Sequence, residues 1–372
     1  MAKENGKAQG SGAYELILQP GAGIKPLLTA IDDARERIEV VIFRFDKPEV
    51  EEALIAAVKR GVPVQALIAN TNRGGERNLR GLETRLLAGG VTVARTADDL
   101  ARYHGKMMIV DRKMLYVLAF NFTALDIDRS RSFGIATSSP ALVAEAVKLF
   151  EADCRRLPYE PAHGALLVSP INAREELSEF LSAARKELLI YDPCVGDPRM
   201  VRLLEERSRA GVKIRLIGRL KRGGDTIDVR PLAPMRLHTR TIIRDRVAAF
   251  VGSQSLRTIE LDGRREIGLF VEDRAILSTL CRVFESDWSV GGTAVAPALS
   301  SDKLAKKVAK AISKELPPVA EVIESVAAEL PSHAVTTEGI DLETLEESIR
   351  NAVKTVVKDA IQEVAGKAQA VP

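Results

Sequence analysis

The stretch RYHGKMMIVDRKMLYVLAFN, residues 102–121, has a second version in RLHTRTIIRDRVAAFVGSQS, residues 236–255. Each version contains a histidine, a basic residue two positions later and an aspartate five positions after that, which is the pattern H-x-[K/R]-x4-D. Around this pattern, both stretches are typical of a strand, a tight polar turn and a second strand. A whole hairpin that recurs with its polar residues indicates a duplicated domain.

The elements before the two hairpins repeat as well. Helical periodicity alternates with short apolar strands in both copies, in the order helix, strand, helix, strand. The predicted elements are helices 24–37, 48–60, 173–185 and 199–210 and strands 38–45, 62–68, 187–193 and 212–218. KRGVPVQALI (59–68) and RAGVKIRLIG (209–218) are versions of one element, 150 residues apart. The sequence therefore predicts a duplicated α/β fold, with two mixed sheets flanked by helices and the active site at their interface.

The predicted organisation has four segments. Residues 1–13 are rich in glycine and polar residues, a composition typical of disorder. Residues 14–158 form the first half and residues 159–292 the second half. All 16 aromatic residues lie before position 301, so residues 293–372 are predicted to be an appended helical tail that contributes little to the core.

The composition favours a soluble globular protein. The chain has 372 residues, of which 46% are hydrophobic and 28% charged. The net charge of +3 does not select nucleic acid as a partner. Cys154, Cys194 and Cys281 lack metal-type spacing, which indicates free thiols in a reducing cytoplasm. With neither a secretory signal nor a run of about 18 apolar residues, we expect a cytoplasmic protein, with peripheral contact at the inner membrane face as an option.

The histidine pattern is too specific to arise easily by chance. The chain has four histidines, and a random one meets this pattern roughly one time in a hundred. His163 and His333 lack the motif and are expected to be structural. A zinc site is disfavoured, because two histidines without a third His or Cys at ligand spacing are a poor ligand set.

Phosphodiester chemistry explains the spacing within each motif. Residues two apart on a strand face the same way, so His104 projects with Lys106, and His238 projects with Arg240. Asp111 and Asp245 fall at the turns, where we expect each carboxylate to fix an imidazole or a cation. Cleavage without a metal or another cofactor needs a nucleophile, an acid and cations for the phosphoryl oxygens. One motif supplies half of that set, so both motifs are predicted to form one site.

These residues resemble the HKD motifs of the phospholipase D superfamily, over roughly residues 15–290. The stretch CRVFESDWS (281–289) is similar to the end of the catalytic region in bacterial cardiolipin synthase-like members. The resemblance implies that one histidine becomes a phosphohistidine while the other protonates the leaving group, and that Lys106 and Arg240 hold the phosphate. It also implies substrate-binding roles for further residues, namely Asn121, Ser253, Ser255 and Glu266.

The two copies depart from the family pattern at different places. Arg240 replaces the usual lysine, Ser255 replaces the asparagine, and Ser132 stands where the second copy has Glu266. If Glu266 lies beside His238, its charge raises the pKa of that histidine and suits it to the acid role. His104 would then be the nucleophile.

Phospholipid is the preferred substrate class, which the resemblance implies. The runner-up is a nuclease of the same superfamily acting on DNA or RNA, and a third interpretation is an inactive phosphate- or lipid-binding protein. Residues 303–316 (KLAKKVAKAISKEL) predict an amphipathic helix with flanking lysines, either docked on its own protein or lying on anionic lipid. The oligomeric state does not follow from the sequence.

Overall fold

The computed structural model describes residues 13–70, 76–162, 164–221, 223 and 226–291. They belong to one compact unit that extends to Ala294. The predicted tail 293–372, its segment 303–316, and all but the last residue of the predicted segment 1–13 lie outside the described residues.

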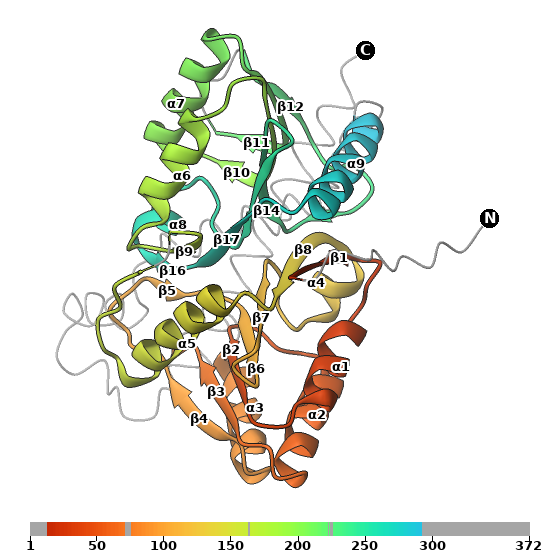
Figure 1. Cartoon of the computed structure of the whole chain (residues 1–372), viewed down its shortest axis with the longest axis vertical. Coiled ribbons are helices and arrows are strands. Elements are labelled where there is room, and N and C mark those ends of the chain that lie inside the picture. The colour runs from red at the N-terminus through yellow and green to blue at the C-terminus, as the bar shows by residue number, and fades with distance from the viewer. Residues whose placement is uncertain (1–12, 71–75, 163, 222, 224–225, 292–372) are drawn as a thin grey trace, which may run out of the picture. The chain divides into compact units, whose positions relative to one another are not determined.

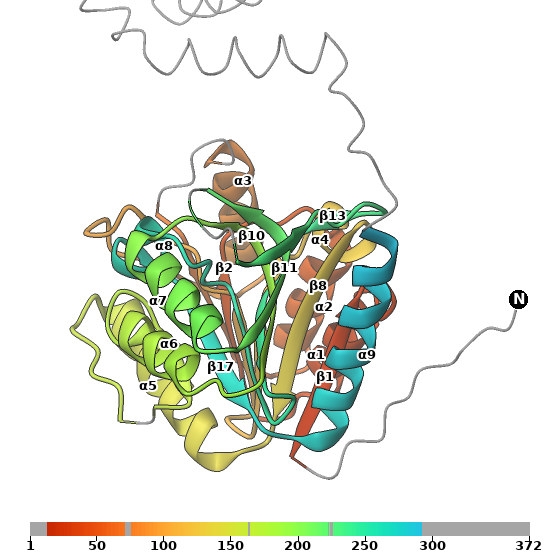
Figure 2. The same ribbon diagram turned by 90° about the horizontal axis from the view of Figure 1, so that it is seen from above.

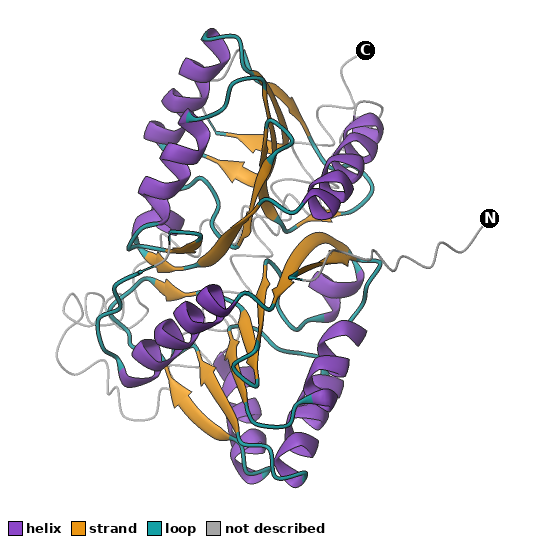
Figure 3. Ribbon diagram, in the orientation of Figure 1, coloured by secondary structure: helices purple, strands orange, loops and turns teal. Residues whose placement is uncertain are grey.

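Strands and helices alternate along the described chain, and a similar series of elements occurs twice (Figures 1 and 3). The first series is β1 (Tyr14–Gln19), α1 (Lys25–Asp33), β2 (Ile38–Ile42), α2 (Pro48–Lys59), β3 (Val64–Ile68), α3 (Glu76–Ala88), β4 (Thr92–Arg95), β5 (Arg102–Tyr103), β6 (Met107–Val110), β7 (Met114–Leu118), α4 (Ala124–Asp128), β8 (Ser130–Thr137) and α5 (Pro140–Arg155). The second series is β9 (Leu166–Val168), α6 (Ala173–Ser182), β10 (Glu187–Val195), α7 (Pro198–Arg209), β11 (Lys213–Leu220), β12 (Asp228–Arg230), β13 (Arg236–Leu237), β14 (Arg240–Arg244), β15 (Ala248–Gly252), α8 (Thr258–Asp262), β16 (Arg264–Arg265), β17 (Ile267–Val271) and α9 (Arg274–Gly291).

The two large sheets share one topology. The first has the order β1-β8-β7-β6-β2-β3-β4, and the second has the order β9-β17-β15-β14-β10-β11-β12. Each strand of the second sheet is the counterpart of the strand at the same place in the first. Both sheets are mixed, because β2 and β10 each have one parallel and one antiparallel neighbour. The predicted duplicated α/β fold is confirmed.

Strand alternation gives each sheet two apolar faces. In the first sheet, Val41 and Ile109 face the other sheet, whereas Val40 and Met108 face the outer helices. Helices α1, α2 and α3 cover the outer face of the first sheet, and α6 and α7 cover that of the second (Figure 1). In the part of the chain that the structure describes, no helix is both long and apolar enough to cross a membrane.

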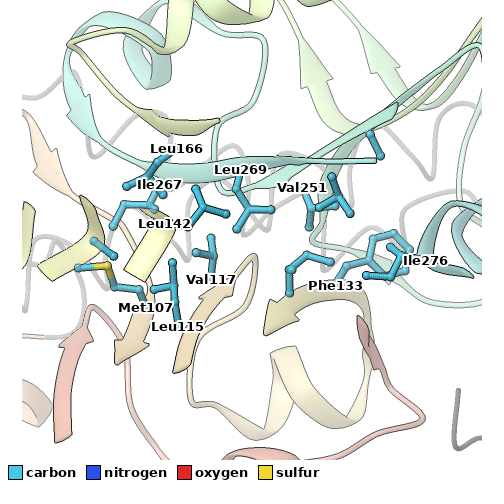
Figure 4. Close-up of a cluster of buried hydrophobic side chains, with 14 of the residues drawn as sticks. Met107, Leu115, Val117, Phe133, Leu142, Leu166, Val251, Ile267, Leu269 and Ile276 are labelled. Carbon is cyan, nitrogen blue, oxygen red and sulfur yellow. The ribbon is translucent and has the colours of Figure 1, made fainter. Parts of the chain in front are cut away.

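The two inner faces share one apolar core (Figure 4). Side chains from β6, β7 and β8 meet side chains from β15 and β17, and α5 and α9 pack against the same core. Members drawn from both sheets include Met107, Leu115, Val117, Phe133, Val251, Ile267 and Leu269. Burial of this surface holds the halves face to face, since each apolar side chain removed from water contributes about 1.5–3 kcal/mol.

Two short strand pairs also join the halves. β5 of the first half pairs in parallel with β16 of the second half, and β13 of the second half pairs in parallel with β8 of the first (Figure 2). β5 and β13 are counterparts in the duplication, so each half has one short strand that pairs with a strand of the other half. Both strands end immediately before a motif histidine.

Candidate active site

The paired strands place the two motif histidines at the interface of the halves. The backbone N–H of His104 donates to the carbonyl oxygen of Arg265 at 2.7 Å, and the N–H of His238 donates to that of Arg131 at 3.0 Å. These two contacts are related by the duplication, because each residue lies 134 positions from its counterpart. Each motif therefore begins on a strand that the opposite half holds in place.

His104 is enclosed by groups from both halves. Its Nδ1 lies 2.8 Å from Oε2 of Glu266, which belongs to the second half. Lys106 places its Nζ 2.9 Å from Nδ1 and 3.0 Å from Nε2 of the same ring. Phe43, which directly follows β2, meets the imidazole edge to face with 4.5 Å between ring centroids. All four side chains are buried, so the ring has little room to rotate.

His238 has a different carboxylate neighbour. Oδ2 of Asp126, on α4 of the first half, lies 3.5 Å from its Nε2. Asn121 donates to that oxygen from its backbone N–H at 3.0 Å and from its side-chain amide at 2.6 Å. Arg236 donates to the other oxygen of Asp126. The carboxylate is thus fixed by three donors and directed at the ring of the opposite half.

Lys106 and Arg240 occupy equivalent places. Lys106 Nζ donates to the carbonyl oxygen of His104 at 2.6 Å, and Arg240 Nη1 donates to that of His238 at 2.8 Å. The pKa of Lys106 responds to Glu266 and Arg240 of the second half as well as to Asp126 of its own. The charges of the two motifs therefore act on each other across the interface of the halves.

Burial controls protonation of these groups. It lowers the pKa of Lys106 from 10.5 to about 7, and it lowers the pKa of both motif histidines well below the usual range, with Lys106 and Arg240 adding to the effect. Burial also raises the pKa of Glu266. Both imidazoles are therefore neutral near pH 7 in the free site, and an anion that binds there favours the protonated forms.

The expectation that Asp111 and Asp245 each fix an imidazole or a cation is wrong, because both carboxylates bind backbone N–H groups instead. Asp111 accepts the backbone N–H groups of residues 35–37 at 2.6–3.1 Å, and Asp245 accepts those of residues 185–187 at 2.7–2.9 Å. The reason is the hairpin itself, since the five residue steps from Lys106 to Asp111 span about 16 Å of extended strand. The aspartates therefore stabilise the hairpin turns, at the ends of the strands that lie away from the histidines.

The placement expected for Glu266 is also wrong, since it lies beside His104 and not beside His238. The strand that carries Glu266 continues from β16, which pairs with β5, and β5 leads into His104. A carboxylate of one half thereby reaches the histidine of the other half.

The two serines of the second copy are less directly placed. Ser253 Oγ accepts the backbone N–H of Ile267 at 3.1 Å, so it joins β15 to the strand that follows Glu266. Ser255 bonds to Asp192 through its hydroxyl and donates its backbone N–H to Glu260 at 2.9 Å. Ser255 therefore binds the acidic residues Asp192 and Glu260, whereas Asn121 binds Asp126.

The sequence interpretation missed Asp126, Glu260 and Arg236. Asp126 and Glu260 are 134 residues apart and each follows the asparagine or serine of its motif by five positions. Both are buried, at 3% and 2% exposed. A residue-by-residue alignment of the two copies would have identified this pair of acids.

The comparisons with known proteins agree with the fold. Residues 27–154 match the family model described as the cardiolipin synthase, phospholipase D-like domain. A polyphosphate kinase from Porphyromonas gingivalis superposes with a TM-score of 0.63 at 21% identity, over 74% of this chain and 50% of that one. This chain thus spans half the length of that kinase.

A phosphatidylserine synthase from Haemophilus influenzae Rd KW20 superposes with a TM-score of 0.57 at 12% identity, over 74% of this chain and 85% of that one. No curated protein sequence matches. The family match bears out the resemblance to phospholipase D-like proteins for residues 27–154, and the two superpositions show a shared fold.

Proposed function

We propose that this phospholipase D-like chain is a metal-independent phosphodiesterase or phosphatidyltransferase that acts on phospholipids through a phosphohistidine. The observation that supports it most is the pairing of the two motifs across the interface of the halves. His104 and Lys106 come from the first half, whereas Glu266 and Arg240 come from the second. Neither half holds a complete catalytic set, so one shared site fits the arrangement better than two independent ones.

Lys106 and Arg240 hold the phosphate. Both side chains are almost fully buried, at 1% and 9% exposed. An anion that enters the site meets cations with little water around them, so the attraction is stronger than at the surface. The bound anion also favours the protonated form of Lys106, whose pKa of about 7 in the free site reflects burial.

His104 attacks phosphorus with Nε2. Glu266 accepts a hydrogen bond from Nδ1–H, which keeps the proton on Nδ1 and the lone pair on Nε2. The N–P bond forms as the bond from phosphorus to the leaving oxygen breaks. His238, protonated in the substrate complex, gives its proton to that oxygen.

The second step reverses the proton transfer. Water or an alcohol gives its proton to His238, and its oxygen attacks phosphorus as the N–P bond breaks. Water produces hydrolysis, and an alcohol produces a new phosphodiester. The same residues serve both outcomes, so the acceptor that reaches the site decides between hydrolase and transferase.

Phospholipid is the proposed substrate class because the matched family model describes the phospholipase D-like domain of cardiolipin synthase. We test it by incubating the protein with labelled phosphatidylglycerol, phosphatidylcholine and DNA, with EDTA present throughout. The expected result is headgroup release or a new phosphatidyl ester in EDTA, and no product with His104→Ala.

Cleavage of DNA alone would contradict the phospholipid assignment. Turnover that EDTA abolishes and a divalent ion restores would contradict the phosphohistidine mechanism, because a metal would then supply the charge that Lys106 and Arg240 are proposed to supply.

A further inference from the structure

The two motif histidines do not meet carboxylates in the same way. Glu266 lies 134 residues after Ser132, so the two positions correspond in the duplication. Glu266 contacts Nδ1 of His104, but Ser132 has no carboxylate for His238. Ser132 Oγ and His238 Nδ1 are buried, and neither has a hydrogen-bond partner within the described residues. The support that His104 receives at Nδ1 is therefore absent at His238.

Asp126 brings a carboxylate to the other nitrogen of His238. Its Oδ2 lies 3.5 Å from Nε2, and only 3% of the residue is exposed. Asn121 and Arg236 hold this carboxylate through three hydrogen bonds. Such a buried, fully oriented carboxylate acts on its neighbour more strongly than an exposed one.

Glu260, the counterpart of Asp126, has other partners. Its Oε2 accepts the backbone N–H of Ser255 at 2.9 Å and lies 3.8 Å from Arg240 Nη2. Its Oε1 lies 3.2 Å from Arg264 Nη1. Glu260 thus contacts cations of its own half, whereas Asp126 contacts the histidine of the opposite half.

We propose that Asp126 is a positioning residue that keeps the transferable proton on Nε2 of His238 and thereby makes His238 the acid. The negative charge of Asp126 lies 3.5 Å from Nε2 of His238 and is attracted to a proton there, so Asp126 favours the ring form that carries its proton on Nε2. Glu266 favours the proton on Nδ1 of His104 and leaves a lone pair on its Nε2. The nitrogen that meets a carboxylate thus distinguishes the nucleophile from the acid. The inference rests on the proposed function and deepens it.

The charges around His238 give Asp126 a distinct electrostatic effect. The charged groups that act on the ring are Arg240 on β14, Arg236 on β13, Lys106 before β6, and Asp126 on α4. Burial lowers the pKa of His238 most and the three cations lower it further, whereas Asp126 raises it. Loss of the Asp126 charge therefore reduces the imidazolium available to protonate a leaving group.

The test uses two substrates that share a dihexanoylphosphatidyl group. One carries p-nitrophenolate, which departs without a proton, and the other carries choline, whose alkoxide must be protonated. Asp126→Asn is expected to slow the choline ester about 10²-fold and the p-nitrophenyl ester less than about threefold. The alkaline fall of the choline rate is expected to move to lower pH. Asp128→Asn is the matched control, because Asp128 lies on the same helix with its side chain exposed and paired with Lys47.

An equal loss on both substrates, or no loss on either, would overturn the inference, because a purely structural role does not depend on the leaving group. Wild-type protein that is inactive on both esters would count against the proposed function instead. Thermal unfolding verifies that each variant is folded. Asp126→Glu serves as the second variant, since it retains the carboxylate and is expected to keep the ratio of the two rates near that of wild type.

Discussion

The two halves have one skeleton but different polar residues. Their sheets share a strand order, and their motif histidines hydrogen-bond the opposite half at corresponding positions. Yet Glu266 corresponds to Ser132 and Asn121 corresponds to Ser255. The difference teaches that a site shared by two copies needs a given polar side chain from only one of them. The corresponding residue of the other copy can therefore be substituted.

Features that each half needs for itself are retained in both. Asp111 and Asp245 accept three consecutive backbone N–H groups of their own half. Residues 111 and 112, and their counterparts 245 and 246, all have positive φ between 52° and 58°, a conformation that Asp tolerates better than most residues. Contacts that lie within one half are thus present in both copies. The polar residues of the shared site, in contrast, differ between the copies.

The largest expected effect comes from removing either cation. Lys106→Met and Arg240→Met should each lower kcat/KM by about 10²–10³-fold, because each removes a buried charge from the phosphate. Equal severity from opposite halves is the signature of one shared site. Steady-state kinetics on a phosphodiester checks it, and half-activity in either variant would indicate two independent sites.

Lys106→Met should also stabilise the protein. Burial lowers the pKa of Lys106 to about 7, against 10.5 for the unfolded chain, so the unfolded state holds more protons between those pH values. The cost of burying this lysine is therefore full below pH 7 and falls as pH rises toward 10.5. The gain in Tm should be larger at pH 6 than at pH 9. A gain that grows with pH would show that the cause is not the buried charge.

Glu266→Gln and Ser132→Ala form a matched pair at corresponding positions. Glu266→Gln should lower kcat by about 10²-fold or more, because the amide no longer enforces the Nδ1–H form of His104. Ser132→Ala should stay within about twofold of wild type, since its Oγ has no partner within the described residues. Comparable losses in the two variants would show that both halves support their histidines alike.

Asp111→Ala and Asp245→Ala should affect stability and leave catalysis unchanged. Each should cost about 1–3 kcal/mol in the free energy of unfolding, with kcat per folded molecule as in wild type. Burial opposes ionisation of both carboxylates, but the backbone N–H donors prevail and lower the pKa of each. The stabilisation is therefore present above pH 3.8 and is lost as pH falls through the lowered pKa. Urea unfolding with parallel activity measurements separates the two effects.

Arg240→Lys should have a much smaller effect on activity than Arg240→Met. Lys106 already makes the equivalent contact to the carbonyl of its own histidine, so a lysine should fit at position 240. Activity should fall by less than about tenfold, through loss of the second guanidinium nitrogen near Glu260. A loss as large as that of Arg240→Met would mean that the two halves bind phosphate in different ways.

The sequence predicted the fold well because periodicity and repetition are local signals. Both hairpins, the alternating elements and the pairing of His with Lys or Arg follow from residue spacing alone. One boundary shows what spacing misses: the helix expected over 24–37 ends at Asp33, and Asp111, 78 positions beyond it, takes the backbone N–H groups of residues 35–37. A contact that remote in sequence leaves no periodic trace.

The site was harder to predict because it depends on which strands of one half pair with which strands of the other. The 134-residue period equates Glu266 with Ser132 but does not say that β16 lies beside β5, so the sequence placed Glu266 at the wrong histidine. Asp126 and the exposed Asp128 both lie in the short helix α4, and acidic residues spaced in this way are typical of a solvated helix face. Only the crossing of strands between halves turns it toward His238.

Trapping the covalent intermediate tests the central claim, that two motifs form one site in which His104 attacks phosphorus. His104→Ala and His238→Ala are each mixed with a dihexanoylphosphatidyl p-nitrophenyl ester, quenched, and analysed by peptide mass spectrometry. We expect a phosphatidyl adduct on His104 in the His238→Ala variant, because p-nitrophenolate departs without a proton, and no adduct in His104→Ala. An adduct on His238 in the His104→Ala variant would contradict the account.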